Sequence, residues 1–171
     1  MILKQFALWW IGLAGSLGAA PAPDVPPAPQ VAVYDESWIK DGYPWPADAS
    51  PADIEARRKK VWNEAIFHGD HGLAFWGKFA HEHRKPLTIP EWGVNNRVDM
   101  KEQHGGLDNV YFIEQMHRFI VAPTNHVAFH CYFDVQAPDG HHQLSPSASG
   151  TEKTEFPLAA AKFKQLFGTS R

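Results

Sequence analysis

Short apolar runs alternate with longer stretches of helical periodicity from residue 30 onward. Residues 31–34 predict a first strand, and residues 51–66 predict a helix, because their apolar positions recur every three to four residues. Ser50 fits the N-cap of this helix, since a proline follows it directly and an aspartate lies three residues further on. A second helical stretch covers residues 73–83. The pattern thus predicts one strand followed by two helical segments.

The same alternation continues toward the end of the chain. Residues 87–89 predict a short buried strand, and residues 108–120 predict a helix that Asp108 caps. Residues 126–133 predict a third strand, and a closing helix is expected to begin at Thr154. This order of strands and helices predicts an α/β fold with a parallel sheet. In such folds the loops after the strands, at the carboxyl-terminal edge of the sheet, hold the functional site.

Two segments precede this folded region, residues 30–171. Residues 1–20 combine Lys4 with an uncharged apolar run and end in small residues, which is typical of a secretory signal; the alternative is an arbitrary apolar N-terminus. The run is shorter than the ~20 residues of a membrane-spanning helix, so we expect no stable membrane span. Residues 21–29 hold 5 of the 14 prolines and predict an extended linker. The pattern favours a secreted or periplasmic location.

Composition narrows the classes of function. The formal net charge of −3 argues against a nucleic-acid partner, because nucleic-acid-binding proteins usually carry a basic patch. The single cysteine, Cys131, excludes an internal disulfide and is predicted to be a small buried residue. The ten histidines match no metal-binding template, and His130, between apolar residues of a strand, is expected to be buried and hydrogen-bonded. We therefore predict neither a metal site nor a cofactor.

Glu91 is the first candidate for chemistry. It follows the short apolar strand and stands between a proline and the pair Trp92-Gly93. A carboxylate at the carboxyl end of a parallel strand is expected to point into the crevice at that edge of the sheet. Trp92 is suited to stack on a ligand or to form a wall of the pocket. The alternative is an ordinary surface glutamate at a strand end.

Aromatic residues follow the other two strands at the corresponding positions. Tyr34 ends the first strand, and its hydroxyl is suited to hydrogen-bond a nearby carboxylate. Trp38 lies four residues further on and is suited to stack on a sugar face, with core packing as the alternative. Tyr132 and Phe133 end the third strand, where filling of the core is the alternative.

Three segments, taken in order, resemble the C-terminal part of clan A glycoside hydrolases, most closely family 26, the β-mannanase family. VAVYDESW is similar to the sixth strand of that family and its tyrosine, and HRKPLTIPEWG is similar to the seventh strand and its nucleophile. HVAFHCYFDVQAPDGHHQLSP and FPLAAAKFKQLFG are similar to the eighth strand, its loop and the closing helix. The resemblance covers residues 31–168.

The resemblance implies a partial (β/α)8 TIM barrel that consists of about the last three βα units, strands 6 to 8. It implies retaining hydrolysis of β-mannan or a related β-linked polysaccharide, with that polysaccharide as the partner. Glu91 would be the nucleophile, and Tyr34 would orient it through a hydrogen bond. The sugar-binding walls would be Trp38, Trp92, Tyr132 and Phe133. Phe133 departs from the family, which often has a tryptophan near this position.

The length of the folded region also departs from the family. A full barrel takes ~250 residues, so the first five strands, and the acid/base that the fourth strand carries, have no counterpart in residues 30–171. We therefore expect a truncated barrel with an exposed inner face and with strand edges that favour self-association. Two other functions stay open: a non-catalytic carbohydrate-binding remnant and a His-rich, metal-binding exported protein.

Overall fold

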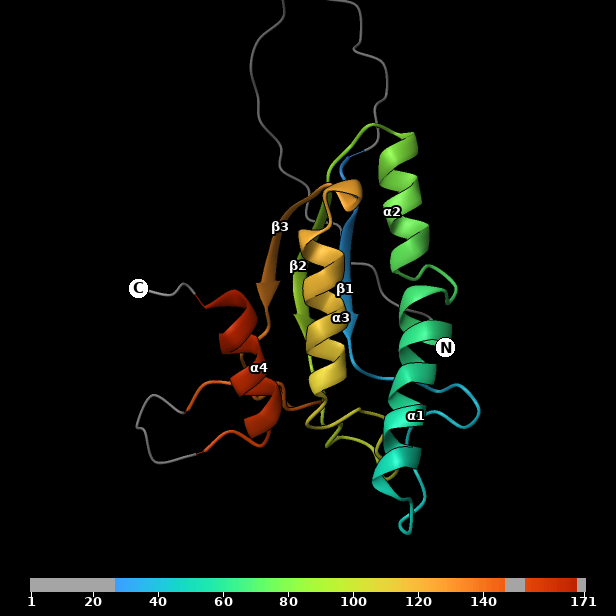
Figure 1. Ribbon diagram of the computed structural model, residues 1–171, viewed down its shortest axis with the longest axis vertical. Coiled ribbons are helices and arrows are strands. Elements are labelled where there is room, and N and C mark those ends of the chain that lie inside the picture. The colour runs from blue at the N-terminus through green and yellow to red at the C-terminus, as the bar shows by residue number, and fades with distance from the viewer. Residues whose placement is uncertain (1–26, 147–152, 169–171) are drawn as a thin grey trace, which may run out of the picture.

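The computed structural model describes residues 27–146 and 153–168 (Figure 1). Its elements follow in the order β1 (Gln30–Tyr34), α1 (Pro51–Val61), α2 (Leu73–Glu82), β2 (Leu87–Gly93), α3 (Val110–Val121), β3 (Val127–Tyr132) and α4 (Pro157–Phe167). A π-helical segment, Trp62–Phe67, extends α1, and a 3₁₀ turn, Pro123–Asn125, precedes β3. The predicted alternation of strands and helices is confirmed. The signal-like segment and most of the predicted linker lie outside the described residues.

The three strands form a parallel sheet in the order β1-β2-β3. Ala32 of β1 pairs with Glu91 of β2, and Leu87 of β2 pairs with Val127 of β3. The strands therefore run in one direction, and their carboxyl ends meet at the lower edge in Figure 1. This arrangement confirms the mixed α/β class and the parallel sheet.

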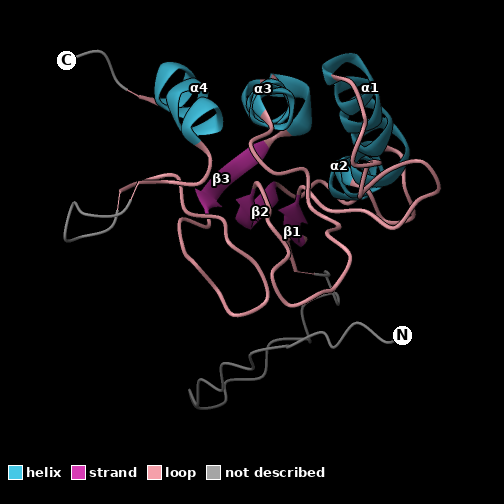
Figure 2. Ribbon diagram, turned by 90° about the horizontal axis from the view of Figure 1, so that it is seen from below, coloured by secondary structure: helices cyan, strands magenta, loops and turns pink. Residues whose placement is uncertain are grey.

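Helices α1 to α4 all lie on one side of the sheet, as the view onto its lower edge shows (Figure 2). The core fills the space between this helical layer and the sheet. Val33 and Ile89 contribute from the strands, while Phe112 and Met116 contribute from α3, and all four are buried. Within the described ranges, no helix is long and apolar enough to cross a membrane.

The opposite face of the sheet carries no helix among the described residues (Figure 2). Phe129 is 50% exposed there, and Cys131 is exposed as well, so the prediction of a buried Cys131 is wrong. Successive strand residues point to opposite faces, which sends Cys131 to this uncovered face and its neighbour His130 toward the helices. His130 accepts a hydrogen bond from Trp92 Nε1 at 3.2 Å, as predicted, but it is only partly buried. One face of the sheet is thus uncovered by helices among the described residues, whereas its being the inner face of a barrel and the expected self-association stay predictions.

The N-caps of the helices agree only in part with the predicted ones. Ser50 caps α1 as predicted, because its Oγ accepts from the Asp53 backbone N at 3.2 Å. The predicted cap of α3 is wrong by one residue, since Asn109 Oδ1 accepts from Phe112 N at 3.2 Å. Asp108 instead caps α4, accepting from the backbone N atoms of Leu158 at 3.0 Å and Ala159 at 2.7 Å. Thr154 lies three residues before α4 and does not cap it.

Replacing Asp108 with alanine is expected to lower the free energy of unfolding by about 1 kcal/mol. The substitution leaves two backbone N–H groups at the start of α4 without their acceptor and removes a negative charge from the positive end of the helix dipole. Urea denaturation followed by far-UV circular dichroism measures the change. Asp48→Ala, at an exposed loop position, is the control. Equal stability of both variants would contradict a capping role for Asp108.

Candidate active site

The structure brings Tyr34 and Glu91 together although they lie 57 positions apart in the sequence. Tyr34 is the last residue of β1, where it pairs with Gly93, and Glu91 lies two residues earlier on the neighbouring strand β2, where it pairs with Ala32. The Tyr34 hydroxyl donates a hydrogen bond to Glu91 Oε1. Both residues lie at the carboxyl-terminal edge of the sheet, where the sequence pattern predicted the functional site.

The environment of Tyr34 keeps its hydroxyl protonated. Burial raises the pKa of Tyr34 far above its ordinary value, and the hydrogen bond to Glu91 raises this pKa further. A tyrosine that holds its proton remains a hydrogen-bond donor over the whole physiological range. Glu91 itself is only partly buried. An oriented, partly buried carboxylate of this kind can serve as a nucleophile, a base or an acceptor for a ligand hydroxyl.

Trp38 and Phe133 lie at the same edge. Trp38 is 56% exposed, and its ring stacks on His104 with the ring centroids 5.2 Å apart. The guanidinium of Arg97 lies 5.6 Å from the Trp38 ring. Phe133 makes an edge contact with Tyr34, with the ring centroids 5.9 Å apart. Their role in contacting a sugar stays a prediction.

Trp92 lies in the core, which corrects the expectation that it forms a sugar-binding wall, whereas the role of the partly exposed Tyr132 stays a prediction. Trp92 is 0% exposed and packs against Phe112 of α3 and Phe163 of α4. Tyr132 lies beside it, and its ring also contacts Phe163, with the centroids 5.1 Å apart. The reason is strand alternation: Glu91 faces the open side of the sheet, so the next residue faces the helices.

Two polar residues that the sequence analysis did not select, Asn95 and Arg97, contact Glu36, which lies two residues after β1. Glu36 Oε2 accepts from Arg97 Nη1 at 2.7 Å and from Asn95 Nδ2 at 3.0 Å. Arg97 also pairs with Asp99 at 2.8 Å. Asn95 and Arg97 follow β2 in the segment VNNR, but nothing in that pattern indicated a contact with Glu36.

A buried polar network supports this edge from behind. Asp35 is 1% exposed and accepts from Tyr43 Oη at 2.9 Å and from Asn109 Nδ2 at 2.7 Å. Burial raises the pKa of Asp35 to about 6, even though these hydrogen bonds lower it. Gly106 allows the loop before α3 to come this close, because a Cβ there would lie 1.9 Å from Asp35 Oδ2. The network joins the end of β1 to the start of α3.

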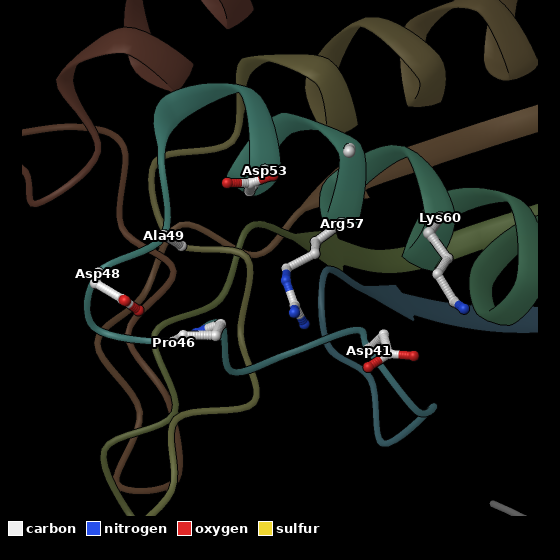
Figure 3. Close-up of a pocket in the computed structure, with 8 residues that line it drawn as sticks. Asp41, Pro46, Asp48, Ala49, Asp53, Arg57 and Lys60 are labelled. Carbon is white, nitrogen blue, oxygen red and sulfur yellow. The ribbon is translucent and has the colours of Figure 1, made fainter.

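A separate cavity of about 410 Å³ lies between α1 and the loop after β1 (Figure 3). Arg57 and Lys60 project from α1 toward this loop. Its polar groups already serve the local structure, since Arg57 donates to the Gly42 carbonyl at 3.2 Å and Asp53 belongs to the cap of α1. None of the predicted site residues lines this cavity.

No group of three or more His, Cys, Asp or Glu side chains in the described ranges is arranged to hold a metal ion. No protein-family model, curated protein or solved structure matches this chain. The interpretation of the site therefore depends on its own geometry.

Proposed function

We propose that this chain is the C-terminal part of a glycoside hydrolase barrel, strands 6 to 8, in which Glu91 is the nucleophile of retaining hydrolysis. The observation that carries this proposal is the hydrogen bond from Tyr34 Oη to Glu91 Oε1 at the ends of two adjacent parallel strands. The resemblance to family 26 assigns the same two roles to the same two residues. The proposed substrate is β-mannan or a related β-linked polysaccharide.

The chemistry requires two carboxyl groups about 5–5.5 Å apart. Glu91 attacks the anomeric carbon while a second carboxyl group protonates the leaving oxygen, and a glycosyl-enzyme forms. The second group then takes a proton from water, whose oxygen attacks the same carbon and releases Glu91. Glu36 is a poor candidate for this second role, because its Oε2 already accepts from Arg97 and Asn95. We assign the acid/base to a part of the barrel outside the three described strands.

A test of Glu91 is available that does not need the acid/base. In a β-mannosyl fluoride with a second fluorine on the carbon next to the anomeric centre, fluoride leaves with its bonding electrons and needs no proton. We expect the full chain to gain the mass of one fluorinated mannosyl group and the Glu91→Gln variant to gain none. Peptide mass spectrometry then locates the label.

The matched control is Glu102→Gln, which changes an exposed glutamate after β2 and is expected to label like the wild type. Tyr34→Phe removes only the hydroxyl that orients Glu91, and we expect its labelling to be slower by at least about tenfold. A label on another residue, or a folded wild-type chain that takes no label, would refute the assignment of Glu91.

A second function, carbohydrate binding without catalysis, is favoured by the exposed Trp38 ring. Such a ring stacks on the flat face of a sugar whether or not a complete catalytic pair is present. If this is the function, titration with manno-oligosaccharides will show binding that survives Glu91→Ala and is lost in Trp38→Ala. Loss of binding in both variants would count against this second function.

A further inference from the structure

The phenol ring of Tyr34 is held between two other rings at the carboxyl-terminal edge of the sheet. The Phe133 ring meets it edge-on, with the ring centroids 5.9 Å apart. The His142 ring lies against it at a tilt of 44°, with the centroids 4.6 Å apart. Phe133 and His142 also contact each other, with the centroids 5.4 Å apart. Each ring therefore touches the other two, and this packing limits the rotation of the Tyr34 side chain.

His142 is fixed in this group by a buried hydrogen bond. It is 4% exposed, and its Nδ1 lies 2.7 Å from the Val94 carbonyl oxygen. A carbonyl only accepts, so Nδ1 carries the proton and donates it. Burial lowers the pKa of His142, although the hydrogen bond to Val94 raises it, so the imidazole is neutral near pH 7. The single N–H group of the neutral ring is thus the one that binds Val94.

Through these contacts His142 joins the ends of all three strands. Its ring packs on Tyr34, the last residue of β1. Its acceptor Val94 directly follows β2 and lies three residues after Glu91. Its own carbonyl accepts from Tyr132 Oη, at the end of β3, at 2.8 Å. The imidazole is therefore fixed relative to the strand that carries Glu91.

The Tyr34 hydroxyl depends on this packing for its position. Within the described ranges, its hydrogen bond to Glu91 is the only one that the hydroxyl makes. No second polar contact there sets its direction. The oxygen lies at the far end of the side chain, so a small rotation of the ring moves it away from the distance and angle that a hydrogen bond requires. The contacts around the ring must therefore keep the hydroxyl directed at Glu91.

We propose that His142 is a positioning residue, whose imidazole holds the Tyr34 ring so that its hydroxyl donates to Glu91. The inference rests on the proposed function, which makes Glu91 the nucleophile, and it adds a residue of the loop after β3 to the groups that orient this nucleophile. Because His142 acts through Tyr34, its effect on Glu91 should vanish once the Tyr34 hydroxyl is removed.

The carbon NMR signal of the Glu91 side-chain carboxylate, recorded on the full chain without a ligand, tests this proposal. Glu91→Gln identifies the signal by its absence. Tyr34→Phe is expected to shift the signal, because the carboxylate loses its donor. His142→Asn keeps a donor for the Val94 carbonyl, since Nδ2 takes the place of Nδ1, but removes the ring that lies against Tyr34. We expect His142→Asn to shift the signal in the same direction as Tyr34→Phe, and to add no further shift in the double variant.

The matched control is His141→Asn, the same substitution at the neighbouring histidine, whose Nδ1 contacts Glu155 at 2.7 Å. It should leave the Glu91 signal unchanged. A second variant, His142→Phe, keeps an aromatic ring against Tyr34, and its Glu91 signal should lie near that of the wild type. If His142→Asn does not fold, as far-UV circular dichroism reports, His142→Phe alone decides. An unshifted signal in Tyr34→Phe or in folded His142→Asn, or a shift in His142→Phe as large as that in Tyr34→Phe, would overturn the proposal.

Labelling with the fluorinated mannosyl fluoride gives a kinetic readout of the same cycle. We expect His142→Asn to label at least about threefold more slowly than the wild type, and the double variant to label no more slowly than Tyr34→Phe alone. Effects that multiply in the double variant would show that His142 does not act through Tyr34. The NMR measurement needs no sugar. A folded wild-type chain that takes no label would therefore refute Glu91 as the nucleophile, while the NMR signal would still decide whether His142 positions Tyr34.

Discussion

Replacing Trp92 with alanine is expected to lower the free energy of unfolding by about 3–5 kcal/mol. The Trp92 side chain is 0% exposed and contacts Phe112 and Phe163 as well as Phe167, so it joins β2 to α3 and α4. Its removal leaves a cavity at the centre of the core, and it also removes the donor to His130 Nδ1. A loss of this size is a large part of the 5–15 kcal/mol that a domain commonly has.

Trp38→Ala is the matched control, because it deletes the same side chain from a position that is 56% exposed. Its expected effect on the free energy of unfolding is below about 1 kcal/mol. Urea denaturation of the full chain, followed by far-UV circular dichroism, compares the two variants without relying on tryptophan fluorescence. A loss below about 1 kcal/mol in Trp92→Ala, as small as that expected of the control, would show that Trp92 is not a core residue. It would also restore Trp92 as a candidate wall of the sugar site.

We expect Asp35 to stabilise the folded chain less as the pH rises from about 4 to 6. Burial raises the pKa of Asp35 in the folded chain from its ordinary 3.8 to about 6. Between these values the unfolded chain releases the proton while the folded chain keeps it, so the folded state loses relative stability as the pH rises. The difference in pKa corresponds to a loss of about 3 kcal/mol, which is complete above pH 6.

The Asp35→Asn variant isolates this contribution, because the amide does not titrate and can still pair with Tyr43 and Asn109. The measurement is urea denaturation of both proteins at pH 4 and at pH 7. We expect the free energy of unfolding of the variant, relative to the wild type, to rise by about 2 kcal/mol between these two conditions, because part of the loss is already present at pH 4. Carboxylates with lowered pKa values, such as Glu155, change both proteins alike and cancel in the difference. A difference that stays constant with pH would show that Asp35 ionises as it does in the unfolded chain.

The contact between Tyr34 and Glu91 was predictable from sequence because it depends on regular structure. Parallel strands end at the same edge of a sheet, so residues at two strand ends meet even when they lie far apart in the chain. The error at Trp92 was also avoidable by the same physics. Successive residues of a strand point to opposite faces, and a crevice that receives Glu91 cannot receive Trp92.

Other features could not be read from local patterns. Asp108 precedes α3 and has the composition of its cap, yet its carboxylate serves α4, 50 residues further along the chain. Asn95, Arg97 and His142 lie in loops, whose paths no periodicity fixes. Their contacts with Glu36 and Tyr34 follow from the packing of the loops against each other, which only the three-dimensional structure supplies.

The uncovered face of the sheet carries a thiol whose alkylation reports on the accessibility of that face. Cys131 is the single cysteine of the sequence, and it is exposed on that face. An alkylating reagent therefore yields one product, which mass spectrometry reads as one adduct per chain. Its rate of formation measures how much of β3 is accessible to solvent. A polypeptide or glycan that binds over this strand slows the alkylation of Cys131. Binding to this face can therefore be measured without introducing a cysteine by mutation.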